Sequence, residues 1–127
     1  MPKLVLVGLG GCFGAIARYL CSGFAHRLYS GSVFPVGTLL VNVLGCFIIG
    51  LTMGLLEDKA GLAPAVRSLF VIGFLGSFTT FSSFGYETVE LLRLSELLLA
   101  GLNILMNFIL GFGAVFLGQM VVRAVVA

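Results

Sequence analysis

Four long apolar stretches dominate this sequence, and most of its charged residues lie between them. The stretches run roughly over residues 4–24, 37–56, 65–92 and 96–126. A helix needs about 20 residues to cross the roughly 30 Å hydrocarbon core of a bilayer, so each stretch is long enough to span it. Four spans with short connections nearly fill 127 residues. We therefore predict an all-α membrane protein, a single four-helix transmembrane domain over residues 1–127.

The composition and the charge pattern exclude several classes of function. With 60% hydrophobic and 9% charged residues, a soluble domain of this size could not bury its apolar surface. The net charge of +2 is spread among the connections, which argues against nucleic acid as a partner. The sole histidine, His26, is predicted to lie in a loop with Tyr29, and the sequence has no Ser-His-Asp set, metal-ligand cluster or phosphate loop. An enzyme is therefore not expected.

Lysine and arginine are divided almost evenly between the two sides of the predicted bundle. Four crossings place both termini on one side. That side carries Lys3, Lys59, Arg67 and Arg123, and the opposite side carries Arg27 and Arg93. Arg18 lies inside the first span and is ambiguous, so the count is four against two or three. The positive-inside rule needs a larger excess in short loops to fix one orientation. We therefore expect dual topology, with insertion both ways round.

Glycine is abundant, with 18 residues, and some glycines lie four apart. Pairs such as Gly10 with Gly14 and Gly50 with Gly54 let helix backbones approach closely, so tight helix packing is expected. A four-helix chain of this length leaves little room for a polar pathway inside its own bundle. We therefore predict a homodimer.

A few polar residues lie inside the apolar stretches. Arg18 lies about two thirds of the way through the first, where a central charge costs roughly 2.5 to 3.5 kcal/mol. It either extends to the interface or serves anions at a vestibule or in folding, and its sign disfavours a cation carrier. Asn42 provides two N–H donors within the second span, either for a neighbouring helix or for a ligand. Asn103 and Asn107 are four apart, so they share a helical face and either bond to other helices or line a polar track.

The third stretch contains the most informative segment, residues 73–84, which combines glycines, hydroxyls and four phenylalanines. Glycine weakens a helix and Ser or Thr can bond freed backbone groups, so we predict a helix broken near the membrane centre. Phe81 and Phe84 share a helical face with Thr80 and roughly with Ser77, although such a stripe is more often packing. Glu87 and Glu90 follow and are interpreted as solvated interfacial charges.

Three segments together resemble the small bacterial fluoride channels of the CrcB/Fluc family in content, order and spacing. They are Gly10-Gly11-Cys12-Phe13-Gly14-Ala15-Ile16-Ala17-Arg18-Tyr19, Gly37-Thr38-Leu39-Leu40-Val41-Asn42, and Gly73 through Phe84. The run Thr-Thr-Phe-Ser-Ser-Phe followed by Glu87 is the most specific. The fourth span is similar only in being apolar and rich in glycine. Ser83 and Ser77 depart from the family, where many members have Thr and Gly.

This resemblance implies passive export of cytoplasmic fluoride across the bacterial inner membrane, which confers fluoride resistance. It implies an antiparallel dual-topology homodimer with two pores, in which the broken third helices cross. The backbone carbonyls of Gly76 and Thr79 would hold a structural Na⁺. The residues implied for the fluoride pore are Asn42, Thr80, Phe81, Ser82, Ser83 and Phe84. Arg18 matches the family arginine of the first helix, and Arg18, Glu87 and Asn103 are assigned to a vestibule or to structure.

Two other functions stay open at this point. A dual-topology small multidrug exporter is also a short four-helix dimer in the lipid bilayer, but it would need a membrane-embedded carboxylate, and the first span offers Arg18 instead. A non-transporting assembly subunit would use the same polar residues only to hold helices together. A measurement of ion flux through the pure protein distinguishes such an assembly subunit from a channel.

Overall fold

The computed structural model describes residues 2–57 and 63–126, and it is built from helices. In chain order they are α1 (Pro2–Leu28), α2 (Val36–Leu56), α3 (Ala63–Val66), the π-helical η1 (Arg67–Leu75), α4 (Gly76–Phe78), α5 (Phe81–Arg93) and α6 (Leu97–Val126). Within the described residues, four segments are long and apolar enough to cross a membrane, and the third of them, Pro64–Arg93, contains η1, α4 and α5. The prediction of an all-α, multi-pass membrane protein is confirmed.

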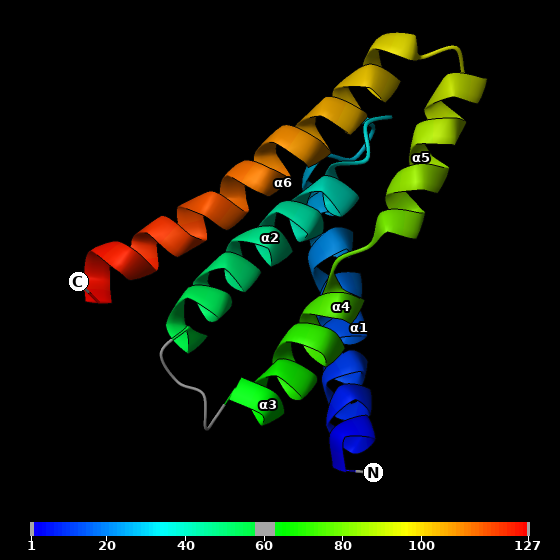
Figure 1. Ribbon diagram of the computed structural model, residues 1–127. Coiled ribbons are helices and arrows are strands. Elements are labelled where there is room, and N and C mark those ends of the chain that lie inside the picture. The colour runs from blue at the N-terminus through cyan, green and yellow to red at the C-terminus, as the bar shows by residue number, and fades with distance from the viewer. Residues whose placement is uncertain (1, 58–62, 127) are drawn as a thin grey trace.

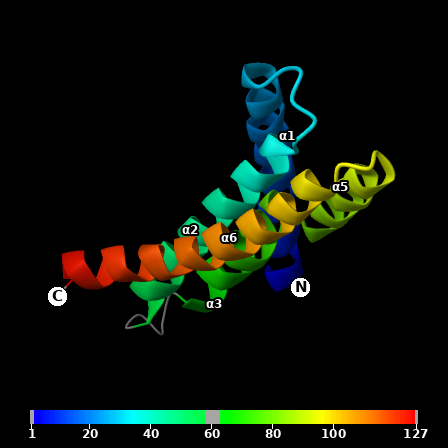
Figure 2. The same ribbon diagram turned by 90° about the horizontal axis from the view of Figure 1, so that it is seen from above.

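Two helix pairs make up most of the packing. Helix α2 lies along α6, and α1 lies along η1 and α4, while α5 packs on α6 (Figure 1). Seen from above, α2 and α6 again run side by side while α1 points away from them (Figure 2). The α1–α2 and α5–α6 connections lie at the same end of the molecule, and both termini lie away from that end (Figure 1). This arrangement agrees with four crossings. Lys59, which entered the count of charges, lies outside the described residues.

Glycines mark the closest helix contacts. A Cβ atom on Gly10 would overlap the Leu69 carbonyl oxygen of η1, and one on Gly14 would overlap the Phe74 carbonyl oxygen. Because only glycine leaves room there, backbone meets backbone between α1 and η1. Gly50 of α2 is equally close to the backbone of α6. The prediction of tight packing through small residues is confirmed.

The surface of the single chain is strongly apolar. Leu98 is 75% exposed and Val125 79% exposed, whereas Val41 and Asn103 are the largest fully buried side chains. Lipid, rather than the protein interior, must cover side chains exposed to this extent, because a water-facing surface would not carry so many of them. The interior is correspondingly small and contains a polar residue at its centre.

Three local features were not predicted from the sequence. His26 is not in a loop, because α1 continues to Leu28 and the His26 ring packs against Gly37 of α2. The widened π-helical η1 was not expected, and no composition signal distinguishes it from an α-helix. At the α5–α6 turn, Ser95 adopts a left-handed φ of 61°. The Glu96 N–H then reaches the Leu91 carbonyl at 2.9 Å, which caps the end of α5.

Candidate functional site

The third segment contains two residues of extended backbone between α4 and α5. Thr79 has φ −84° and ψ 157°, and Thr80 has φ −148° and ψ 116°. We call these two residues the interruption. Thr80 serves as the N-cap of α5, since its Oγ1 accepts the Ser83 N–H at 3.1 Å. The helix therefore restarts at Phe81 with its first turn capped.

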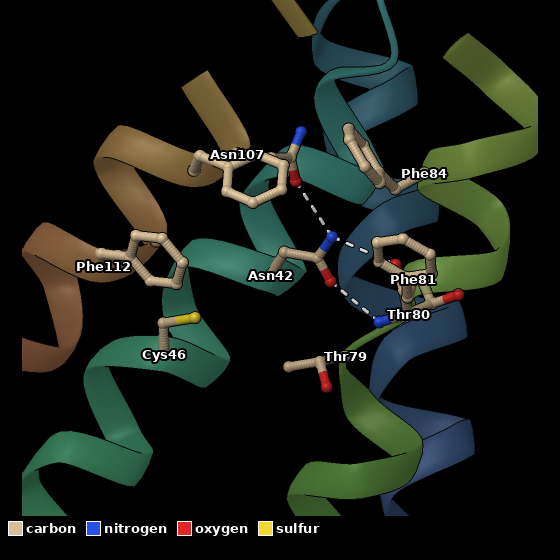
Figure 3. Close-up of a pocket in the computed structure, with 10 residues that line it drawn as sticks. Asn42, Cys46, Thr79, Thr80, Phe81, Phe84, Asn107 and Phe112 are labelled. Atoms are coloured by element: carbon tan, nitrogen blue, oxygen red, sulfur yellow. Dashed lines mark hydrogen bonds between the residues drawn. The ribbon is translucent and has the colours of Figure 1, made fainter. Parts of the chain in front are cut away.

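Asn42 of α2 bonds both backbone groups of Thr80. Its Oδ1 accepts the Thr80 N–H at 2.8 Å, and its Nδ2 donates to the Thr80 carbonyl at 3.1 Å (Figure 3). A continuous helix would have satisfied these groups internally, so the Asn42 amide replaces bonds that the interruption removes. Gly45, one turn further along α2, leaves room for the Thr79 methyl group. The interruption is thus held against one face of α2.

Hydrogen bonds continue from Asn42 into α6 and return to α5. Asn42 Nδ2 donates to Asn107 Oδ1 at 3.0 Å, and Asn107 Nδ2 donates to Asn103 Oδ1 at 3.0 Å. Asn103 Nδ2 donates to Thr88 Oγ1 at 2.9 Å, and that hydroxyl donates to the Phe84 carbonyl at 2.7 Å. We call Asn42, Asn107, Asn103 and Thr88 the amide chain. Because every bond points in the same direction, each polarises the next.

A cavity of about 270 Å³ lies where the interruption, α2 and α6 meet. We call it the ring cavity; it is lined by Asn42, Cys46, Thr79, Thr80, Phe81, Phe84, Asn107, Phe108, Gly111 and Phe112. Figure 3 shows Asn42 near its middle, with Phe81 and Phe84 from α5 on one side and Phe112 from α6 on the other.

The four phenylalanine rings of this cavity contact one another in sequence. Phe81 and Phe84 have ring centroids 5.6 Å apart at 56°, and Phe84 meets Phe108 at 6.4 Å and 69°. Phe108 meets Phe112 at 5.7 Å and 78°. The last two pairs are edge-to-face and the first is tilted. The positive edge of an aromatic ring is the part that attracts negative charge. The cavity therefore combines amide groups with strongly tilted rings.

A second cavity, of about 290 Å³, lies between α1, α2 and α5. We call it the polar cavity; it is lined by Ala15, Arg18, Tyr19, Ser22, His26, Thr38, Val41, Thr80, Ser83 and Glu87. Thr80 lines both cavities. Arg18 is half-buried here, and in the part of the chain that the structure describes the only ion pair joins Arg93 to Glu90. The guanidinium of Arg18 thus faces the polar cavity without a directly paired carboxylate among these residues.

The interpretation of both glutamates as solvated charges is correct only for Glu90. Glu90 pairs with Arg93 on the surface at 2.9 Å. Glu87 is half-buried and its Oε1 accepts the Thr38 hydroxyl at 2.7 Å. Its Oε2 is buried and meets no donor among the described residues. The difference arises because α5 turns this residue toward α2 rather than toward the membrane surface.

The structure brings most of the predicted site residues together. Asn42, Thr79, Thr80, Phe81 and Phe84 line the ring cavity, and Arg18, Ser83 and Glu87 line the polar cavity. The remaining predicted residues lie elsewhere. Ser82 is exposed with its Oγ 3.3 Å from Thr80 Oγ1, and Asn103 is fully buried in the amide chain. Gly76 is exposed on α4. Ser77 does not join the stripe of Phe81 and Phe84, because the interruption turns α4 so that Ser77 faces Gly11 of α1.

Sequence reasoning missed part of the ring cavity. Phe108 and Phe112 come from α6, and Cys46 and Gly111 complete its wall. The available signal was that Phe108 and Phe112 are four apart and that each directly follows Asn107 or Gly111, which are also four apart. On an apolar helix, however, rings at this spacing are equally typical of a lipid-facing surface.

Comparisons with known proteins identify the family. Residues 5–119 match the family described as CrcB-like protein, Camphor Resistance (CrcB). The chain is 40% identical over 126 residues to the fluoride-specific ion channel FluC of Maridesulfovibrio salexigens, covering 96% of this chain and 99% of the relative. It is 46% identical over 122 residues to the protein of the same name from Shewanella baltica, covering 96% of this chain and 97% of the relative. It is 45% identical over 118 residues to the fluoride-specific ion channel FluC of Nitratidesulfovibrio vulgaris, covering 93% of this chain and 94% of the relative. With matches over nearly its whole length, this chain belongs to the CrcB family.

Proposed function

We propose that this protein is a fluoride-selective channel that lets fluoride leave the cytoplasm passively and so confers fluoride resistance. The observation that carries the proposal is the ring cavity, in which amide groups and tilted rings meet beside the interruption. The named relatives support the same ion. An ion channel is not an enzyme, and no chemical step or cofactor turnover enters this proposal.

The chemistry of the ring cavity suits a small, strongly hydrated anion. Such an ion gives up water only if N–H groups, O–H groups or positive ring edges replace it. Asn42 supplies N–H groups, the hydroxyls of Thr80, Ser82 and Ser83 lie around the interruption, and Phe81 and Phe84 offer ring edges. A larger halide would fit the tilted rings less closely. Selectivity then follows from the donors and the size of the cavity together.

The polar cavity supports an entry route to this site. It contains the half-buried Arg18, whose positive charge attracts anions, and it shares Thr80 with the ring cavity. Only Thr80 then lies between an anion in the polar cavity beside Arg18 and the ring cavity. We assign Arg18 and Glu87 to this vestibule. Asn103 acts from the buried end of the amide chain, where it orients Asn107.

A passive pore is sufficient to remove fluoride from a cell. Hydrogen fluoride crosses lipid and ionises in the more alkaline cytoplasm, so the anion accumulates there. A negative-inside potential then drives each negative charge outward by about 2.3 kcal/mol per 100 mV. We therefore propose that the protein lies in the cytoplasmic, or inner, membrane of a bacterium, where this potential exists.

We further propose that the working unit is an antiparallel homodimer with two pores. Phe81 is 78% exposed in the single chain although it lines the ring cavity, and Gly76 on α4 is also exposed. A second copy crossing at the interruption would cover both and complete the cavity wall. The near-even distribution of Lys and Arg allows the opposite insertion that such a dimer needs. The crossing point would then lie near the membrane centre.

Dual topology predicts accessibility of one loop from both sides of the membrane. In a variant without Cys12, Cys21 and Cys46, we expect Ser30→Cys in the α1–α2 connection to react with a membrane-impermeant thiol reagent added from either side. Ser30 is exposed and its side chain makes no hydrogen bond to the described residues, so the change is mild. About half of the protein should be labelled in intact cells, and all of it should be labelled in permeabilised cells. Complete labelling, or none, in intact cells would contradict the proposal.

The interruption also fits a structural Na⁺ held by the carbonyls of Gly76 and Thr79. In a continuous helix these oxygens would accept the N–H groups of Thr80 and Ser83. Those two N–H groups donate instead to Asn42 Oδ1 and to Thr80 Oγ1. Carbonyl oxygens freed in this way suit a hard cation. When bound, the ion would neutralise the two carbonyl dipoles and so hold the crossing helices together.

Because this site uses backbone oxygens, removing a side chain should matter less than re-forming the helix. We expect Thr79→Ala to retain Na⁺-dependent dimer stability, although its hydroxyl bond to the Leu75 carbonyl at 3.0 Å is lost. Gly76→Leu favours a continuous helix by about 1 kcal/mol and adds bulk at the exposed crossing, so it should abolish that dependence. The measurement is dimer dissociation in detergent with Na⁺ or with a large organic cation. Equal dependence in both variants would count against a backbone site.

A cell-based experiment tests the proposed function. We expect expression of this chain in a bacterial strain without its own fluoride exporter to restore growth at fluoride concentrations that stop the parent strain. Internal fluoride should fall at the same time. Unchanged fluoride tolerance with the protein present in the membrane would overturn the proposal, and tolerance to cationic dyes instead would indicate a multidrug exporter.

A further inference from the structure

The side-chain amide of Asn42 has no unused donor in this structure. Its Nδ2 has two N–H groups, which donate to the Thr80 carbonyl at 3.1 Å and to Asn107 Oδ1 at 3.0 Å. Its Oδ1 accepts the Thr80 N–H at 2.8 Å, so a flipped amide would place N–H against N–H. Asn42 therefore has one orientation, with one N–H on the backbone and the other directed at Asn107.

Asn107 is oriented from its other side. Its Nδ2 donates to the Asn103 backbone oxygen at 2.8 Å and to Asn103 Oδ1 at 3.0 Å. Asn103 is fully buried and is itself bonded to Thr88. Both hydrogen-bonding ends of the Asn107 amide are therefore assigned, and its oxygen points at Asn42 (Figure 3).

The side-chain donors of Asn42, Thr79 and Asn107, which line the ring cavity, are all engaged. The Thr79 hydroxyl donates to the Leu75 carbonyl at 3.0 Å, and the Thr80 hydroxyl oxygen lies 3.3 Å from Ser82 Oγ while it accepts the Ser83 N–H. An anion that binds the Asn42 amide must therefore take a donor that is already bonded. Of the hydrogen bonds that Asn42 makes, only the one to Asn107 joins two side chains, so it can open without moving the backbone of Thr80.

We infer that Asn107 Oδ1 occupies the position on Asn42 that fluoride takes during passage, so Asn107 is a specificity-determining positioning residue. This inference rests on the proposed function. A hydrogen bond to an anion is roughly twice as strong as one to a neutral amide oxygen, so a strongly accepting anion displaces Asn107. A weakly accepting halide does not, and it meets a cavity whose donors stay closed. Asn107 thus sets the minimum strength of the hydrogen bond that an anion must accept from Asn42 in order to enter.

Asn107→Leu tests this directly, because leucine has similar bulk and no acceptor. We expect the half-saturating fluoride concentration for flux to fall by about 5-fold, since one neutral hydrogen bond no longer competes. Chloride flux should rise as the Asn42 N–H becomes free. Asn107→Asp keeps the oxygen and adds negative charge, so it should raise the half-saturating concentration by about 10-fold or more. Met106→Leu, at the preceding half-buried position on α6, is the matched control and should behave as the parent protein.

The comparison is made on folded protein in liposomes, with fluoride varied over a wide range. A purely structural Asn107 would change the yield of folded protein but not the half-saturating concentration of what remains. An unchanged or higher value in Asn107→Leu would overturn the inference. If Asn107→Leu does not fold, Asn107→Asp decides, and parent-like flux from it would overturn the inference as well. Absence of fluoride flux in the parent protein would instead overturn the proposed function.

Discussion

Replacing Phe81 or Phe84 with isoleucine is expected to reduce fluoride flux by about 100-fold, which corresponds to roughly 2.7 kcal/mol at the barrier. Isoleucine keeps the position apolar but removes the ring edge that we propose attracts the anion. The two changes should differ in stability. Phe84 is only 7% exposed and packs on Phe108, so its loss should destabilise the protein by about 1 kcal/mol. Phe81 is 78% exposed in the single chain and should have less effect.

The matched control is Phe116→Ile, which changes a ring on α6 that lies outside the ring cavity. Phe116 is 68% exposed, and its replacement should leave flux at the parent value. Efflux from liposomes and size-exclusion profiles are measured for all three variants. Parent-like efflux from well-folded Phe81→Ile and Phe84→Ile would remove the rings from the mechanism and leave them as packing.

A large effect on stability is expected from adding one methyl group at Gly14. A Cβ there would overlap the Phe74 carbonyl oxygen, and backbone of α1 and η1 would have to separate. Overpacking of this kind costs about 3 kcal/mol, at the upper end of its usual range because no flexible side chain can move aside. We expect Gly14→Ala to yield little folded protein, as measured by thermal unfolding in detergent.

Gly8→Ala is the matched control on the same helix. A Cβ on Gly8 meets nothing within 4 Å, so the change should be neutral or stabilise α1 by up to about 1 kcal/mol. If Gly14→Ala unfolds at the same temperature as Gly8→Ala, the close contact between α1 and η1 is not needed for the fold.

The four spans could be predicted because a bilayer restricts sequence more directly than water does. Each span must be long and apolar, and the few charges then mark its ends. Glycine spacing likewise predicted close contacts, and Gly10 and Gly14 make them with η1. The extended residues Thr79 and Thr80 lie inside the stretch where glycines and hydroxyls cluster. These are local properties, which a single sequence displays.

The partners of the polar side chains could not be predicted, because they depend on how helices far apart in sequence align. Asn42 and Thr80 are 38 positions apart, and nothing in either segment specifies that one amide would bond both backbone groups of the other. Glu87 was misjudged for the same reason, since its contact with Thr38 depends on the rotation of α5. The π-helical form of η1 has no periodic signature that nine residues could reveal.

The central claim is that this protein conducts fluoride selectively, and it is tested most directly by ion efflux from liposomes that contain only the purified protein. Fluoride and chloride are loaded together, and a potassium ionophore starts the release while electrodes follow both ions. We predict rapid release of fluoride and retention of chloride. Fluoride release no faster than from protein-free liposomes, or chloride release as fast as that of fluoride, would contradict the claim.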